Sequence, residues 1–197
     1  MNKTLVVYSS QYGHTKKYAQ WLTEELNADI CEMKNINAAQ LKDYSTIIFG
    51  SSLYAGKNKG ATILAKYFEQ IKDRKIVLFT VGMYDTSSEE IIIGINKELN
   101  KVITPEMREK IKIFHIRGGI DCQNLSFLHK IMMKAAHTIF SKKPENELTD
   151  SDRDFLAFYG KKIDFSDKKM LEPIREYCTT SVLYNYSPPF RNTTAPE

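Results

Sequence analysis

The 197-residue sequence predicts an α/β fold: a doubly wound parallel sheet of five strands in the order 2-1-3-4-5. Short β-branched runs alternate with amphipathic helical segments along the chain. Two of the runs, at 3–8 and 75–81, are apolar on both faces, as in strands covered by helices on each side. A helix follows the first strand, and right-handed crossovers then favour this five-strand order over the six-strand dinucleotide-binding order.

Each element has its own local signal. Strands are expected where β-branched and aromatic residues cluster, and helices where apolar residues recur every three or four positions. A capping box is expected at 87–90, and Thr149 is expected to cap the last helix, whose buried face would be Phe155, Leu156, Tyr159 and Ile163. The expected strands span 3–8, 29–33, 45–50, 75–81 and 111–116, and the expected helices span 14–26, 61–71, about 87–102 and a stretch from 149.

Length and cysteine usage indicate one domain in a reducing compartment. We expect a domain over 1–175 with a helical insert at about 118–148, and a tail over 176–197 without assigned chemistry. Its cysteines are odd in number and widely separated, which argues against a disulfide framework. The sequence contains no apolar run of membrane-spanning length and no signal peptide, so the expected location is the cytoplasm.

Composition and charge exclude several classes of function. Hydrophobic residues make up 42% of the chain and charged residues 26%, as in ordinary globular domains. A net charge of +4 is too small for a dedicated nucleic-acid-binding protein, so no nucleic acid is expected as a partner. The four histidines include no HExxH pair, so we expect solvated histidines and no metal site. No Gly-x-Ser-x-Gly elbow occurs, and no catalytic residue is assigned.

The loop after the first strand is the main candidate binding site. Residues 9–15 read Ser-Ser-Gln-Tyr-Gly-His-Thr and lead directly into a helix. A helix N-terminus offers free N–H groups and a positive dipole end, and Gly13 permits close backbone approach, which suits a phosphate. A plain helix cap is the alternative. Two other phosphate-binding motifs are absent. The dinucleotide fingerprint G-x-G-x-x-G needs three glycines, and this loop has only Gly13; segment 50–58 resembles a P-loop but has Asn58 where a P-loop has a hydroxyl residue.

This loop resembles the phosphate loop of flavodoxins, T/S-x-T-x-G-x-T in its looser form. Ser9, Gly13 and Thr15 match, whereas Gln11 replaces a hydroxyl residue. The resemblance implies that the loop wraps the 5′-phosphate of FMN. It also implies that the loops after the third and fourth strands flank the flavin ring. The residues expected to hold FMN are Ser9, Ser10, Gln11, Tyr12, Gly13, His14, Thr15, Ser51, Ser52, Leu53, Tyr54, Ala55, Gly56, Val81, Gly82, Met83 and Tyr84.

Aromatic and apolar residues in those two loops fit a flat ring. Leu53 or Tyr54 would cover one face of the flavin and Tyr84 the other. The alternative is that the tyrosines are only half-buried anchors of their loops.

The insert contains a basic amphipathic segment. Between 122 and 143 there is no acidic residue. The four lysines of this segment, Lys130, Lys134, Lys142 and Lys143, carry a charge of +4, which equals the net charge of the whole chain. Such a segment either packs on the domain with its lysines solvated, or contacts a membrane or a partner. Its apolar face is expected to comprise Leu125, Leu128, Met132, Ala135, Ala136 and Ile139, widened by Phe127, Ile131 and Phe140.

An insert after the fifth strand resembles the one in flavodoxin-like menaquinone-dependent protoporphyrinogen dehydrogenases and related flavodoxin domain proteins. The resemblance covers roughly residues 1–175, and its main stretches are 9–15, 50–56, 117–121 and 128–134. It implies an FMN-dependent oxidoreductase of heme biosynthesis that takes electrons from a porphyrinogen and passes them to a quinone. It also implies peripheral contact with the inner face of the membrane through 122–143.

The sign of the net charge bears on the partners. Electron-carrying flavodoxins are typically acidic, whereas this chain is basic, which favours a partner with negative charge. Arg117, Lys57 and Lys59 are the expected contacts for substrate carboxylates. A soluble electron-transfer flavodoxin and a flavodoxin-fold binding module without redox activity stay open as alternatives.

Overall fold

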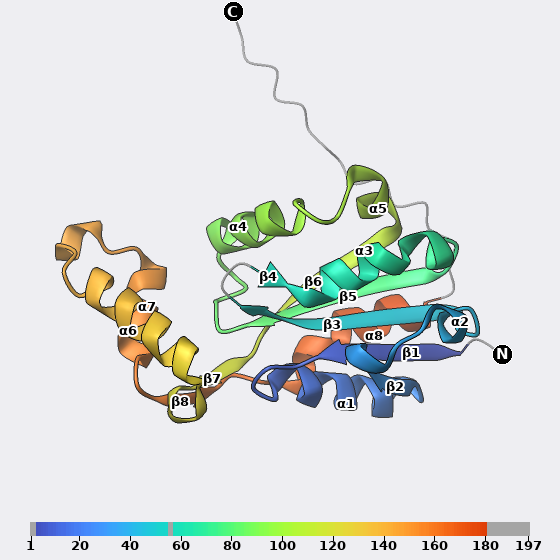
Figure 1. Cartoon of the computed structure of the whole chain (residues 1–197), viewed down its shortest axis with the longest axis horizontal. Coiled ribbons are helices and arrows are strands. Elements are labelled where there is room, and N and C mark those ends of the chain that lie inside the picture. The colour runs from blue at the N-terminus through green and yellow to red at the C-terminus, as the bar shows by residue number, and fades with distance from the viewer. Residues whose placement is uncertain (1–2, 55–56, 181–197) are drawn as a thin grey trace, which may run out of the picture.

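Five parallel strands form the centre of the described part of the chain (Figure 1). The computed structural model describes residues 3–54 and 57–180. The strand order is β2-β1-β3-β5-β6, which is 2-1-3-4-5 once the short antiparallel β4 beside β3 is set aside, so the predicted fold is confirmed. The strands are β1 (Thr4–Ser9), β2 (Asp29–Glu32), β3 (Thr46–Tyr54), β4 (Lys57–Asn58), β5 (Lys75–Gly82) and β6 (Ile111–Arg117).

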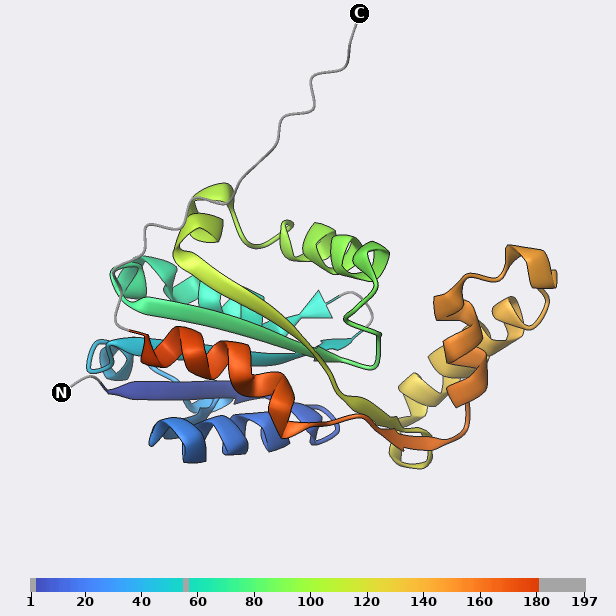
Figure 2. The same cartoon turned by 180° about the vertical axis from the view of Figure 1, so that it is seen from behind.

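Helices cover both faces of this sheet. Residues of β5 alternate between two cores: Ile76 and Leu78 belong to one, Val77 and Phe79 to the other. Successive side chains of a strand point to opposite faces, so a fully apolar strand needs a helical layer on each side. One layer comprises α1 (His14–Leu26) and α8 (Glu172–Thr179), which Figure 2 shows from behind; the other comprises α2 (Ala38–Leu41), α3 (Lys59–Ile71), α4 (Glu89–Leu99) and α5 (Pro105–Lys110).

After β6 the chain leaves the sheet and returns only at Asp164. This excursion, residues 119–164, contains β7 (Gly119–Asp121), α6 (Phe127–Phe140), α7 (Asp150–Phe158) and β8 (Lys162–Asp164). β7 and β8 pair antiparallel and form its stem, while α6 and α7 pack on each other and stand out from the sheet (Figures 1 and 2). The insert is therefore longer than the expected 118–148.

The helix capped by Thr149 exists, but it is not the last helix of the domain. Thr149 and Asp152 form a capping box at the start of α7, as the local sequence indicates. However, α7 packs against α6 in the excursion, through contacts such as that between Phe155 and Phe140. Of the expected buried face, Ile163 lies in β8 rather than on this helix. Local capping signals fix where a helix starts but not what it packs against.

The last helix of the sheet layer is α8. Ile174 of α8 and Leu171 just before it are fully buried against α1. The expected boundary at 175 falls inside this helix, so 176–179 belong to the domain rather than to a tail. Most other α8 side chains are exposed. Because this helix has few apolar positions, its sequence shows no clear helical period.

The capping box expected at 87–90 does not form. Ser88 occupies the N-cap of α4 without a side-chain capping bond. Ser87 instead donates from its backbone nitrogen and its hydroxyl to Asp85 Oδ1, at 2.9 and 2.8 Å. Asp85 thus takes the Ser87 N–H that the box would have bonded to the Glu90 carboxylate.

In residues 3–54 and 57–180 no helix is both long and apolar enough to cross a membrane.

Candidate functional site

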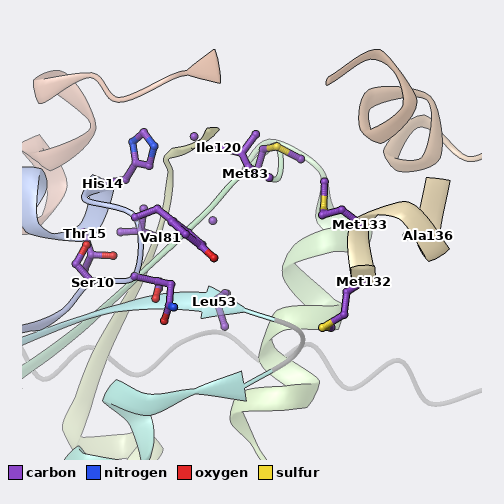
Figure 3. Close-up of a pocket in the computed structure, with 15 residues that line it drawn as sticks. Ser10, His14, Thr15, Leu53, Val81, Met83, Ile120, Met132, Met133 and Ala136 are labelled. Carbon is purple, nitrogen blue, oxygen red and sulfur yellow. The ribbon is translucent and has the colours of Figure 1, made fainter. Parts of the chain in front are cut away.

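A cavity of about 300 Å³ lies at the carboxyl ends of β1, β3 and β5 (Figure 3). The helix that follows β1 (α1) and the helix that follows β3 (α3) lie on opposite faces of the sheet. Open α/β sheets bind ligands at such a switch point. The excursion closes one side of the cavity. The lining residues are Ser10, Gln11, Tyr12, His14 and Thr15 after β1, Ser52 and Leu53 of β3, Val81 and Gly82 of β5 with Met83 just after it, Gly119 and Ile120 of β7, and Met132, Met133 and Ala136 of α6.

The β1–α1 loop and the first turn of α1 lie beside this cavity. Gly13 has a φ of 95°, a conformation that side chains rarely tolerate, and it occupies the N-cap of α1 without a side-chain capping bond. Its own N–H bonds back to Ser10 Oγ at 3.1 Å, which shapes the loop. The buried Thr15 lies in the first turn of α1 and lines the cavity. The first-turn N–H groups have no side-chain cap, and groups of this kind at a helix start suit an anion.

His14 links this loop to the stem of the excursion. Its Nδ1 lies 3.1 Å from Ser166 Oγ and 3.3 Å from Asp164 Oδ1, and Lys17 Nζ donates to Asp164 Oδ2 at 2.9 Å. Burial tends to raise the pKa of Asp164, but hydrogen bonds from Ser166 and Lys17 outweigh it and hold that pKa well below its ordinary value. Burial lowers the pKa of His14 despite the neighbouring carboxylate. The imidazole is therefore held in a fixed orientation, and burial favours its neutral form.

A second contact joins the same loop to α6. The hydroxyl of Tyr12 contacts Nδ1 of His129, and the two rings meet edge to face with centroids 5.7 Å apart. The backbone nitrogen of Ser126, the N-cap residue of α6, also donates to this hydroxyl at 3.4 Å. The loop and α6 are thereby fixed relative to each other, and α6 forms a wall of the cavity.

The structure brings most of the expected FMN-binding residues together, and it separates the rest. Ser9 and Gly13 line a second hollow together with Lys59, and Ser10 lines both this hollow and the cavity. Ser51 is buried, and its hydroxyl accepts a bond from Gly60 N at 2.9 Å, so it supports the start of α3. Tyr54 pairs through its backbone with Lys57, while Ala55 and Gly56 lie outside the described residues.

Tyr84 does not line the cavity, which corrects the expectation that it covers one face of a flavin ring. Its ring lies against Gly82, where a Cβ would collide with it, and packs onto the core beneath α4. Its hydroxyl lies 3.1 Å from Thr80 Oγ1, and burial raises the pKa of Tyr84. Because Gly82 has no side chain, the ring folds back into the core rather than over the strand ends.

Five lining residues come from the excursion and were not among the expected FMN-binding residues: Gly119, Ile120, Met132, Met133 and Ala136. Gly119 is tightly enclosed, since a Cβ there would lie 2.7 Å from Cε1 of His14 and 2.9 Å from Cα of Asp164. The two adjacent glycines at 118 and 119 were the only local signal of such close approach.

The expected role of Arg117 for substrate carboxylates does not fit its surroundings. Its guanidinium stacks on Phe165 at 3.9 Å, with Asp85 and Asp154 at 3.9 and 3.8 Å. These partners hold the side chain at the base of the excursion, so it serves to anchor that segment. Of the other expected contacts, Lys59 faces the second hollow.

The expectation of solvated histidines is also wrong for His115. This residue is half-buried on β6, and its Nδ1 lies 2.7 Å from Thr80 Oγ1. Burial, assisted by the nearby Arg108, lowers the pKa of His115 to about 4. His137 is likewise in contact, stacked on Tyr159 of the excursion.

Several known proteins resemble this chain. An uncharacterized protein of Methanocaldococcus jannaschii is 27% identical over 126 residues, which cover 61% of this chain and 75% of that protein. Flavodoxin 2 from Bacillus cereus is 19% identical with a TM-score of 0.40, covering 79% of this chain and 94% of that one. A flavoprotein from Lactobacillus acidophilus, solved in complex with FMN, is 14% identical with a TM-score of 0.37, covering 59% and 93%. Structural similarities of this size do not bear on function.

The family assignment has stronger support. The family model described as "Flavodoxin domain" matches residues 5–147, well over half of the chain. The matched region includes the five parallel strands of the described sheet except Thr4 of β1, and the β1–α1 loop with Gly13 at its turn. The chain belongs to the flavodoxin domain family.

Proposed function

We propose that this protein binds FMN in the cavity beside the β1–α1 loop and acts as an oxidoreductase. The observation that carries the proposal is the composition of that cavity: uncapped helix amides and hydroxyls at one end, and an apolar wall at the other. Its volume of about 300 Å³ lies at the lower end of the usual range for ligand pockets. The amides of α1 suit a phosphate, and the apolar wall suits a flat ring.

The residues fit FMN without a change of fold. Thr15 and the first-turn amides of α1 would hold the phosphate, with Ser10 at the turn of the loop. Leu53 and Met83, with the methionines of α6, would contact the ring. When bound, FMN supplies the exchange of one or two electrons. The chain itself would position the cofactor and exclude water with α6, while burial favours the neutral form of His14 beside the site.

The wall formed by α6 favours an oxidoreductase with a substrate cavity over a bare electron carrier. Met132, Met133 and Ala136 stand opposite the strand-end loops, so a ring held there would be covered rather than exposed at its edge (Figure 3). We propose a quinone as the electron acceptor, because these side chains form an apolar approach to the site. We propose a porphyrinogen as the electron donor, because the insert resembles that of the protoporphyrinogen dehydrogenases. Reduction of the bound flavin by a porphyrinogen tests this part of the proposal directly.

A visible absorption spectrum of the desalted protein, before and after addition of FMN, tests cofactor binding. We expect oxidised-flavin bands that stay with the protein. Oxidation of the reduced flavoprotein by a soluble quinone, and its reduction by a porphyrinogen, are then followed at the flavin band. Retained flavin without turnover of either compound would point to the carrier flavodoxin. A protein that binds no FMN would overturn the proposal and leave a binding module without redox activity.

Replacing Thr15 with valine tests the phosphate site. The substitution keeps the shape of the buried side chain but removes the hydroxyl, so we expect FMN affinity to fall by roughly three- to tenfold, or ~0.5–1.5 kcal/mol. Thr23→Val on the same helix is the matched control, since its hydroxyl bonds to Ala19 O instead. Affinity is measured by quenching of FMN fluorescence. Equal losses in both variants would argue against a phosphate at Thr15.

A further inference from the structure

Helix α6 has two faces with different surroundings. At 100° per residue, one face comprises the half-buried His129, Met133, Ala136, His137 and Phe140, which face the cavity, the β1–α1 loop and α7. No residue of α6 is fully buried. A second face is apolar and points to solvent, although such side chains usually face the core. We call it the outer face; it comprises Phe127, Leu128, Ile131, Met132, Ala135 and Ile139.

The outer face is both continuous and strongly exposed. The exposed fractions are 80% for Phe127, 64% for Leu128 and 60% for Ile139. Its six residues occupy a sector of about 140° on the helical wheel, without a charged residue inside it. Because α6 and α7 stand out from the sheet, the domain does not cover this face (Figures 1 and 2). A single exposed Leu would need no explanation, but a contiguous patch does.

Positive charge borders this face. Lys130 and Lys134 project next to it on the helix, and no acidic residue occurs between 122 and 143. The acidic side chains of the neighbouring α7 segment are largely engaged: Asp152 pairs with Lys143 at 2.8 Å, and Asp154 lies 3.8 Å from Arg117. Glu145 pairs with Arg153. Among residues 3–54 and 57–180 no salt bridge is formed by Lys130 or Lys134, so they make the border of the outer face cationic.

We infer that the outer face of α6 docks on an anionic lipid surface. An apolar sector flanked by lysines is the arrangement with which helices lie in a bilayer interface: the apolar side chains enter the acyl boundary and the lysines stay at the headgroups. A second copy of the chain fits less well, since symmetric pairing would bring the same lysines together. Met132 belongs to both the outer face and the cavity wall, so docking brings the cavity to the lipid surface.

Sedimentation of the full chain with vesicles tests this inference. We expect binding to vesicles of phosphatidylcholine mixed with phosphatidylglycerol, weak binding to phosphatidylcholine alone, and loss of binding at high salt. Leu128→Glu with Ile131→Glu, and separately Lys130→Glu with Lys134→Glu, should each weaken binding at least about tenfold. These side chains are exposed, so the variants should keep the fold, which circular dichroism checks.

Ile93→Glu is the matched control, because Ile93 is an equally apolar side chain, 67% exposed, on α4. It should bind vesicles as the unmodified protein does. The inference would be overturned if both α6 double variants bound vesicles as well as the unmodified protein does. It would also be overturned if the unmodified protein bound no lipid but formed a concentration-dependent dimer that Leu128→Glu with Ile131→Glu dissociates. Vesicle binding is measured with and without FMN, so failure here is distinguishable from failure of the redox proposal.

Discussion

Replacing Gly119 with alanine is expected to lower FMN affinity at least about tenfold and the free energy of unfolding by ~1–3 kcal/mol. The added Cβ would collide with the carbonyl oxygen of Ile163 and approach Cε1 of His14 to 2.7 Å. The carbonyl oxygen of Ile163 and Cα of Asp164, also within 3 Å, are backbone atoms, so the β7–β8 stem must open and His14 must move. Either change alters the wall of the cavity and the contact between His14 and Asp164.

Gly94→Ala is the matched control for that substitution. Gly94 is exposed in the interior of α4, and a Cβ there meets nothing within 4 Å. Alanine should raise the free energy of unfolding by up to ~1 kcal/mol, because it favours the helix and restricts the unfolded chain. Chemical denaturation and FMN titration of both variants check the pair. Unchanged FMN affinity in Gly119→Ala would show that the stem does not shape the site.

Acidification from about pH 7 to about pH 5 is expected to cost about 2 kcal/mol of stability through His115 alone. Burial lowers the pKa of this side chain from 6.5 in the unfolded chain to about 4 in the folded protein. Between these values the unfolded chain binds more protons than the folded one, so stability falls as pH falls and is fully recovered above about pH 7. His14, whose pKa is also lowered by burial, acts in the same direction.

Denaturation curves at both pH values, for the unmodified protein and for His115→Gln, measure this contribution. Glutamine cannot titrate but can still form a hydrogen bond with Thr80. Between about pH 7 and about pH 5 the stability of this variant should therefore fall by about 2 kcal/mol less than that of the unmodified protein, and the fall that is left would come from groups such as His14. His137→Gln is the control, since that ring stacks on Tyr159 outside the sheet. The same pH dependence in His115→Gln and in the unmodified protein would assign it to other groups.

Much of the sheet could be predicted because its signals are local. Runs such as Ile76–Val77–Leu78–Phe79 are apolar at every position, and only a strand covered on both faces buries all of them. The strand order then follows from the few crossovers that handedness permits. The β1–α1 loop could be predicted for the same reason, since Gly13 and the helix start that follows are adjacent in sequence.

The excursion could not be read from local pattern, because amphipathic helices do not specify their partner. Helices α6, α7 and α8 each carry some apolar residues, yet only α8 covers the sheet, through Leu171 and Ile174. The sequence likewise does not specify whether the Tyr84 ring points to the cavity or to the core. The ring lies in the core because it packs against Gly82 and its hydroxyl contacts Thr80 Oγ1.

The sequence by itself thus determined the strand order and the phosphate-type loop, because both depend on neighbours along the chain. Only the tertiary structure decided which helix walls the cavity. The contacts of Tyr12 with His129 and of His14 with Asp164 join segments more than 100 residues apart, and no periodicity encodes such contacts. They fix α6 beside the cavity with its outer face in solvent, because the stem and the loop hold it away from the sheet.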